Sequence, residues 1–152
     1  MTLLRASSKL DFPAPPERLF DLLAPERAPE WDRSILSVAQ IRGPLGPGAR
    51  YRETHRVLFR AHAIDLEVTE YEPPQRIAYR TVSGGPPSTT RYELVPSPEL
   101  TTVRISAEAR IGGLLIILAP LLRRVIRRQL PETLRALKSH CDAQPAANPR
   151  SH

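Results

Sequence analysis

Several features are scarce in this chain of 152 residues, and each scarcity excludes a class of protein. The single cysteine, Cys141, excludes an internal disulfide and a zinc cluster built from cysteines. The longest apolar run, residues 111–122, is shorter than the roughly twenty residues that span a bilayer, so we expect no transmembrane helix. The first residues, MTLLRASSKLDF, lack the apolar stretch of a secretion signal. We therefore expect a cytoplasmic protein.

Aromatic residues make up only 5% of the chain, which is few for a protein that stacks single-stranded nucleic acid on its rings. The net charge of +6 comes almost entirely from residues 114–140, where six basic residues stand against Glu132 alone. The rest of the chain is close to neutral. Since no recognition helix accompanies the charge, we expect nucleic acid not to be a partner.

The chain begins with a strand and two short helical segments. Apolar and polar residues alternate over residues 3–12, a period typical of a half-buried strand. Pro15 and Pro16 then favour the start of a short helix over residues 15–23. A second short helical turn follows and carries the only tryptophan, Trp31.

Six further strands and a long helix make up the rest of the chain. Turn residues divide the strands into hairpin-length steps, which predicts an antiparallel meander. The predicted strands are residues 34–41, 49–58, 61–71, 75–82, 88–95 and 101–111. An apolar stripe at helical spacing then predicts a C-terminal helix from Pro120 to Cys141. We expect one domain over residues 2–141 and a disordered tail over residues 142–152, which is broken by proline.

This order of elements is an α+β arrangement that resembles the helix-grip fold of the START/Bet v 1-like (SRPBCC) superfamily. In that fold, a seven-stranded antiparallel sheet curves around a long C-terminal helix, and two short helices follow the first strand. Four sequence segments resemble the polyketide cyclase/dehydrase branch in particular: FPAPPERLFDLLAPERAPEWD, GPLGPGARYRE, TEYEPPQRIAYR and LRALKSHCDA. The resemblance implies a cavity between the sheet and the long helix, and it implies that no metal or cofactor is needed.

Alternation along the strands predicts which side chains face that cavity. In residues 61–71 the even positions are apolar and the odd positions are mostly polar, and in residues 101–111 the odd positions are apolar. The same rule turns one tyrosine inward on each of three strands. The predicted ligand-binding residues are Trp31, Tyr51, Tyr79, Tyr92, Ile64, Leu66, Ile105 and Ala107.

Three ionisable residues, Glu53, His55 and His62, fall on this otherwise apolar face. If the hairpin turns at Phe59 and Arg60, His55 lies opposite Ile64, and the two histidines are diagonal neighbours within reach of one molecule. Such a cluster favours general acid/base catalysis, with Glu53 orienting one imidazole. The alternative is that the three groups are partly hydrated and inert. They are also ligand types that suit zinc, but the family resemblance is to proteins without metal.

The aromatic residues have two interpretations each. The hydroxyls of Tyr51, Tyr79 and Tyr92 either bind carbonyl oxygens of a ligand or bond to the backbone within an ordinary core. Trp31 either lies at the mouth of the cavity, as the family resemblance implies, or only packs its turn against the sheet.

Arginines on the polar face of the last helix have three interpretations: a hydrated surface, a docking site for an acidic carrier protein, or a contact with an anionic membrane. These residues are Arg123, Arg124, Arg127 and Arg128.

The sequence therefore predicts a protein that binds a hydrophobic, oxygenated small molecule. The more specific hypothesis is a polyketide-type cyclase or dehydratase that works without a cofactor, in which His55 or His62 moves the proton. The rival hypothesis is a carrier or sensor of a lipid, quinone or polyketide without catalytic activity.

Overall fold

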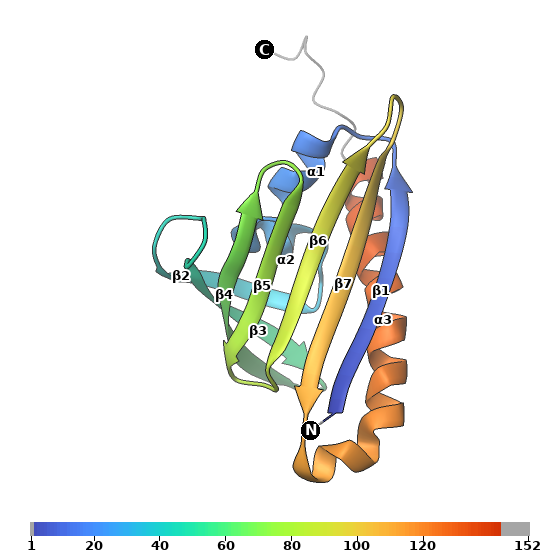
Figure 1. The fold of residues 1–152 in the computed structure, drawn as a ribbon. Helices are drawn as coiled ribbons and strands as arrows, with labels where there is room; N and C mark the ends of the chain where they lie inside the picture. The colour runs from blue at the N-terminus through green and yellow to red at the C-terminus, as the bar shows by residue number, and fades with distance from the viewer. Residues whose placement is uncertain (1, 144–152) are drawn as a thin grey trace.

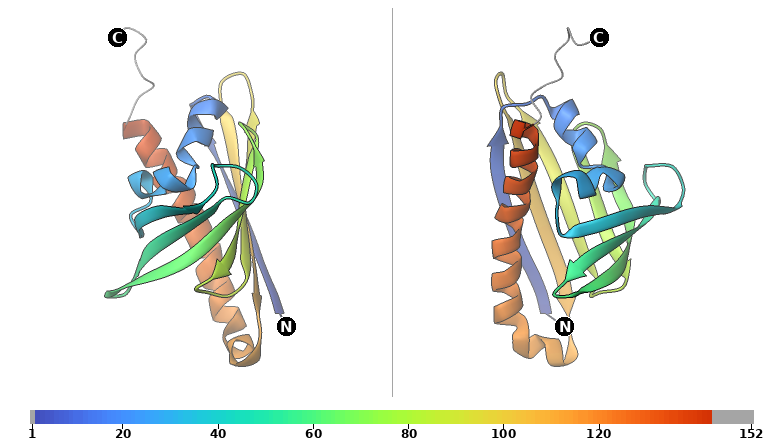
Figure 2. Two further views of the ribbon diagram at one scale, coloured as in Figure 1. Left: turned by 90° about the vertical axis from the view of Figure 1, so that its left-hand side faces the viewer. Right: turned by 180° about the vertical axis from the view of Figure 1, so that it is seen from behind.

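The computed structural model describes residues 2–143, which form one antiparallel sheet with helices on one face (Figures 1 and 2). The strands are β1 (Thr2–Phe12), β2 (Ile35–Arg42), β3 (Arg50–Val57), β4 (Arg60–Glu72), β5 (Arg76–Ser83), β6 (Ser88–Pro96) and β7 (Thr101–Ile111). Their order in the sheet is β1-β7-β6-β5-β4-β3-β2. β2 to β7 therefore form a continuous meander, and β1 pairs with β7 in antiparallel orientation.

The helical elements are α1 (Pro16–Leu22), the 3-10 helix η1 (Pro25–Arg27), α2 (Ala28–Trp31), the 3-10 helix η2 (Gly113–Leu118) and α3 (Ala119–Ala143). The 25-residue helix α3 runs along the concave face of the sheet, and α1 and α2 lie beside it on the same face (Figure 2). This arrangement confirms the predicted α+β helix-grip fold. Within residues 2–143, no helix combines the length and apolar character needed to cross a membrane.

The predicted strand ends agree with the structure to within one residue, because turn residues interrupt the alternation sharply. Helix α3 continues to Ala143, two residues past the expected end of the domain at residue 141. The remainder of the expected disordered tail, residues 144–152, lies outside the described residues.

The main core lies between the sheet, α1 and α3. Phe12, Leu19, Ile77, Val103 and Leu137 are fully buried in it. Alternation in the strands and a helical stripe in α3 aim these apolar side chains at one another, which removes their surface from water and stabilises the fold.

The predicted register of the β3–β4 hairpin is wrong. The turn consists of Leu58 and Phe59, so His55 pairs with His62 and not with Ile64. Leu58 allows the earlier turn by adopting the left-handed conformation, with φ of 56°. Moving a turn by one residue shifts the pairing by two residues, and the inward and outward faces predicted for both strands are therefore retained.

Strand β2 has a bulge near each end, between Ile35 and Ser37 and between Gln40 and Arg42. A bulge adds one unpaired residue and reverses the alternation beyond it. This is the physical reason why the apolar residues of β2 fit neither face consistently in the sequence.

Candidate functional site

A cavity of about 360 Å³ lies between the sheet, α2 and α3, a volume in the range of small-molecule sites. Three of its lining residues, Pro86, Glu108 and Gln129, are exposed. The cavity therefore reaches the solvent beside α3 and the β5–β6 loop.

Most of the cavity wall is apolar. The sheet supplies the floor, Trp31 from α2 supplies one side, and Ile126 and Leu130 from α3 supply the roof. Seven of the eight predicted ligand-binding residues line it: Trp31, Tyr79, Tyr92, Ile64, Leu66, Ile105 and Ala107.

Glu53 and His55 form an ion pair in the wall of this cavity. Both residues project inward from β3, and Nε2 of His55 donates to Oε1 of Glu53 across 2.9 Å. The Glu53 side chain is buried, and that hydrogen bond raises the pKa of His55, against the opposing effect of burial. Because a carboxylate only accepts, the proton of a neutral His55 stays on Nε2, and Nδ1 keeps a free lone pair.

His62 does not join this pair. Although it lies opposite His55 in the ladder, its side chain is exposed and is not part of the cavity wall. Its Nε2 contacts the carbonyl of Gly84 in the β5–β6 loop at 2.5 Å. The structure therefore places His55 in the cavity wall and His62 outside it, with the His62 ring against the loop carbonyl.

Tyr51 is also absent from the cavity wall, contrary to its predicted role. It is almost completely buried in a separate cluster with Ala49 and Val68, beside the loop between β2 and β3. It faces inward as alternation predicts, but a different set of side chains covers it.

Tyr79 and Tyr92 both line the cavity, in an edge-to-face pair with ring centroids 6.4 Å apart. The Tyr79 hydroxyl donates to the carbonyl of Leu23, so it has no proton left for a ligand. The Tyr92 hydroxyl forms no hydrogen bond with another part of residues 2–143. Burial raises the pKa of both phenols well above the ordinary value, which keeps Tyr92 a hydrogen-bond donor at neutral pH.

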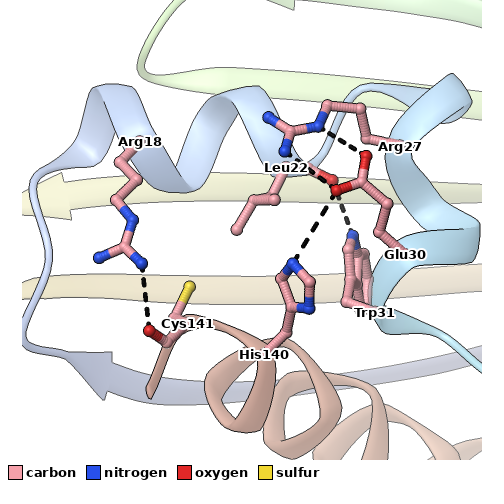
Figure 3. A network of polar contacts seen from close by, with 7 residues as sticks. All are labelled: Arg18, Leu22, Arg27, Glu30, Trp31, His140 and Cys141. Atoms are coloured by element: carbon pink, nitrogen blue, oxygen red, sulfur yellow. Dashed lines mark hydrogen bonds and ion pairs between the residues drawn. The ribbon is translucent and has the colours of Figure 1, made fainter. Parts of the chain in front are cut away.

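Trp31 is held in the wall by contacts between the short helices and the end of α3 (Figure 3). Its Nε1 donates to the Leu22 carbonyl across 2.7 Å. Arg18 of α1 donates to the carbonyl of Cys141 across 3.1 Å, and Nε2 of His140 lies 4.0 Å from Oε1 of Glu30. Trp31 is therefore both a packing residue of its turn and part of the cavity surface.

Seven polar residues of the cavity wall were not singled out from the sequence as site residues: Asp32, Thr81, Ser88, Thr90, Glu108, Gln129 and Thr133. Asp32 follows α2, where no periodicity predicts an orientation. Its negative charge contributes to the raised pKa of His55, after the contribution of Glu53. Gln129 and Thr133 are one helical turn apart beside the apolar stripe of α3, and this spacing is a signal that would have found them.

The four predicted docking arginines lie near the start of α3, away from the cavity wall. Arg124, Arg127 and Arg128 are exposed and Arg123 is half-buried. None of them forms an ion pair with any part of the chain that the structure describes.

A curved sheet that grips a long helix over an apolar cavity defines a class of small-molecule-binding proteins with the helix-grip fold. Residues 4–142 match the family described as "Polyketide cyclase / dehydrase and lipid transport", and the chain belongs to that family.

Solved structures with this fold include proteins of different origin. A START superfamily protein from Mycobacterium smegmatis is 16% identical with a TM-score of 0.77, and the match covers 93% of this chain and 99% of that one. Ara h 8.0201 is 14% identical with a TM-score of 0.75, over 93% and 99% of the two chains. The di-domain ARO/CYC StfQ from the steffimycin biosynthetic pathway is 15% identical with a TM-score of 0.77, over 93% of this chain and 51% of that one. At these identities the likeness shows the fold alone. The search of curated proteins gave no match.

Proposed function

We propose that the protein binds a hydrophobic, oxygenated small molecule in the cavity and catalyses an aldol-type cyclisation or dehydration of it without a cofactor. The observation that supports this proposal is the Glu53–His55 ion pair, which lies in the wall of a mostly apolar cavity. A buried ionisable pair costs desolvation energy, and such pairs in clefts are frequently functional.

In the proposed reaction, Nδ1 of neutral His55 takes a proton from the carbon next to a ligand carbonyl. The electron pair of that C–H bond forms a new C–C bond to a second carbonyl carbon of the same ligand. The oxygen of the second carbonyl receives the proton from His55, which restores the neutral imidazole. Glu53 stabilises the imidazolium between the two transfers, and Tyr92 donates a hydrogen bond to a ligand oxygen.

Loss of water from the resulting alcohol uses the same residue. His55 takes a second proton from the carbon beside the alcohol carbon, and the electron pair of that C–H bond forms a C=C double bond to the alcohol carbon. The C–O bond breaks, and the hydroxyl leaves as water with the proton that His55 returns. The cavity contributes by holding the two reacting carbons close together, which removes much of the entropic barrier. Few chemical groups are therefore required.

Transport without catalysis is the second candidate. The family description includes lipid transport, and most of the cavity wall is apolar. A carrier requires only this surface, and the Glu53–His55 pair would then serve to position the ligand.

The first experiment is native mass spectrometry of the purified protein, which identifies any small molecule that copurifies with it. A polyketide or aromatic ketone supports the enzyme, and a phospholipid or quinone supports the carrier.

The second experiment measures proton abstraction directly, with the bicyclic aromatic ketone 1-tetralone in D₂O. NMR follows deuterium exchange at the carbon next to its carbonyl. We expect the native protein to accelerate exchange, His55→Ala to abolish the acceleration, and His62→Ala to retain it. Binding of 1-tetralone without exchange, or exchange that survives His55→Ala, would contradict the catalytic proposal.

A further inference from the structure

One end of the molecule carries two apolar protrusions. Because the meander alternates direction, the β3–β4 turn, the β5–β6 loop and the connection from β7 to α3 all lie at the same end of the sheet. Figure 1 shows this end at the bottom, with the orange η2 segment below the sheet. The turn and η2 each expose bulky apolar side chains.

The first protrusion is the β3–β4 turn. Phe59 is 102% exposed and Leu58 is 87% exposed, and Arg56 and Arg60 flank them. Tight hairpin turns favour asparagine and glycine, which tolerate positive φ, whereas here Leu58 adopts a φ of 56°. Two bulky apolar side chains exposed on a turn that glycine or asparagine would form with less strain indicate a contact outside this chain.

The second protrusion is η2 with the first turns of α3. None of the six residues GLLIIL in η2 is buried, and Leu114 and Ile117 are 84% and 76% exposed. Leu121 and Val125 extend this exposed apolar surface along α3. Arg123, Arg124, Arg127 and Arg128 lie on the same turns of α3, before and after Val125.

Both protrusions carry arginines that no acidic residue in the same segments neutralises. Residues 56–60 and 113–128 contain six arginines and no acidic residue. No ion pair involves any of these six arginines among the residues that the structure describes. Exposed leucine, isoleucine and phenylalanine beside unpaired arginines are typical of proteins that lie in the interface of a negatively charged bilayer.

We propose that this end of the protein docks on an anionic lipid bilayer. The turn at Leu58 and Phe59 and the η2 segment enter the boundary between headgroups and acyl chains, and the arginines contact lipid phosphates. An acidic carrier protein would satisfy the arginines, but it would not account for apolar side chains exposed on two separate protrusions. This inference goes beyond the proposed function, because it holds whether the cavity is catalytic or not.

Docking in this orientation would bring the cavity close to the lipid. His55 lies near the end of β3, three residues before Leu58 of the turn, and Ala109 and Ile126 line the cavity on either side of η2 in the chain. A hydrophobic ligand could then pass between bilayer and cavity with little exposure to water.

The test is flotation of the full chain with two kinds of vesicle, phosphatidylcholine alone and phosphatidylcholine mixed with phosphatidylserine. We expect binding to the mixed vesicles, weak binding to phosphatidylcholine alone, and loss of binding at high salt. The double variant Phe59→Asp/Ile117→Asp should reduce binding to mixed vesicles by roughly tenfold or more. The charge variant Arg124→Glu/Arg127→Glu should reduce it similarly.

Two matched controls lie elsewhere on the surface. Val95 is 62% exposed on β6 at the opposite end of the sheet, and Arg104 is exposed on the outer side of β7. Val95→Asp and Arg104→Glu should leave vesicle binding unchanged. Thermal unfolding of every variant separates a lost docking surface from a lost fold.

Several outcomes would overturn the proposal. These are no binding to mixed vesicles at low salt, equal binding to both vesicle types, or equal losses in Val95→Asp and Phe59→Asp/Ile117→Asp. Light scattering that shows a native dimer, converted to a monomer by Ile117→Asp, would assign the apolar surface to a second copy of this chain. Binding of an acidic carrier protein without any vesicle binding would assign the arginines to that partner. Ligand binding by the docking variants without vesicles should remain native, so failure here is distinguishable from failure of the proposed cavity function.

Discussion

Oε1 of Glu53 accepts a hydrogen bond from Nε2 of His55 across 2.9 Å, and both side chains contribute to the wall of the cavity. The two residues are neighbours on one face of β3, so the backbone holds them together. The hydrogen bond to Glu53 raises the pKa of His55, a residue type that exchanges its proton near neutral pH.

The first prediction concerns the pH dependence of this pair. The hydrogen bond to Glu53 raises the pKa of His55 above its ordinary value of 6.5. The folded state therefore holds this proton more tightly than the unfolded state. The resulting stabilisation is fully present below the unfolded pKa, and it is lost as pH rises through the folded pKa. NMR titration of the His55 ring should show the raised pKa, and Glu53→Gln should lower it.

Chemical unfolding of the native protein and Glu53→Gln across this pH range provides the second readout. The difference in the free energy of unfolding should shrink as pH rises through the folded pKa of His55. A difference that stays constant with pH would show that the pair does not titrate as the geometry indicates.

The second prediction separates the two cavity tyrosines. Tyr79→Phe removes the donor to the Leu23 carbonyl and should lower the free energy of unfolding by about 1–3 kcal/mol. Tyr92→Phe breaks no hydrogen bond within the described residues and should cost less. It should instead weaken binding of 1-tetralone, measured by NMR titration, by roughly threefold to tenfold. Equal effects of the two variants on stability and on binding would contradict the assigned roles.

The third prediction concerns the volume of the cavity. Ala107 on β7 lines the cavity, and Ala107→Phe should fill part of its 360 Å³ and block ligand binding. Ala63 is exposed on the outer side of β4, so Ala63→Phe is a control that should bind normally. Titration with a fluorescent hydrophobic probe, 1-anilinonaphthalene-8-sulfonate, compares the two. Unchanged binding by a folded Ala107→Phe variant would place the ligand elsewhere.

The fourth prediction concerns the loop that borders the cavity. Gly84 has a φ of +89°, and a Cβ there would lie 2.4 Å from the carbonyl oxygen of Ala63. Gly84→Ala should therefore destabilise the protein by about 2 kcal/mol or more. A Cβ on the adjacent Gly85 meets nothing within 4 Å, so Gly85→Ala should change stability by less than about 0.5 kcal/mol. Thermal unfolding tests both, and equal melting temperatures would contradict the close packing of this loop.

The sequence by itself determined the order and bounds of the strands and the face that each regular strand turns inward. Alternation is a local property of the backbone, and turn residues such as Pro13 and Gly84 interrupt it clearly. The same rule located Glu53 and His55, since their spacing of two residues puts both on one face. It also located the apolar floor around Ile105 and Ala107.

Only the tertiary structure decided which inward residues share the cavity. Alternation predicts which face of the sheet a side chain projects from, but not whether other side chains cover it there. It could therefore not separate Tyr51, which other side chains cover, from Tyr92, which borders the cavity. His62 lies outside the cavity wall, and its ring contacts a carbonyl of the β5–β6 loop, which is distant in sequence. Asp32 joined the site through a segment without periodicity. These contacts depend on how separate elements pack against each other, and local backbone geometry carries no information about that packing.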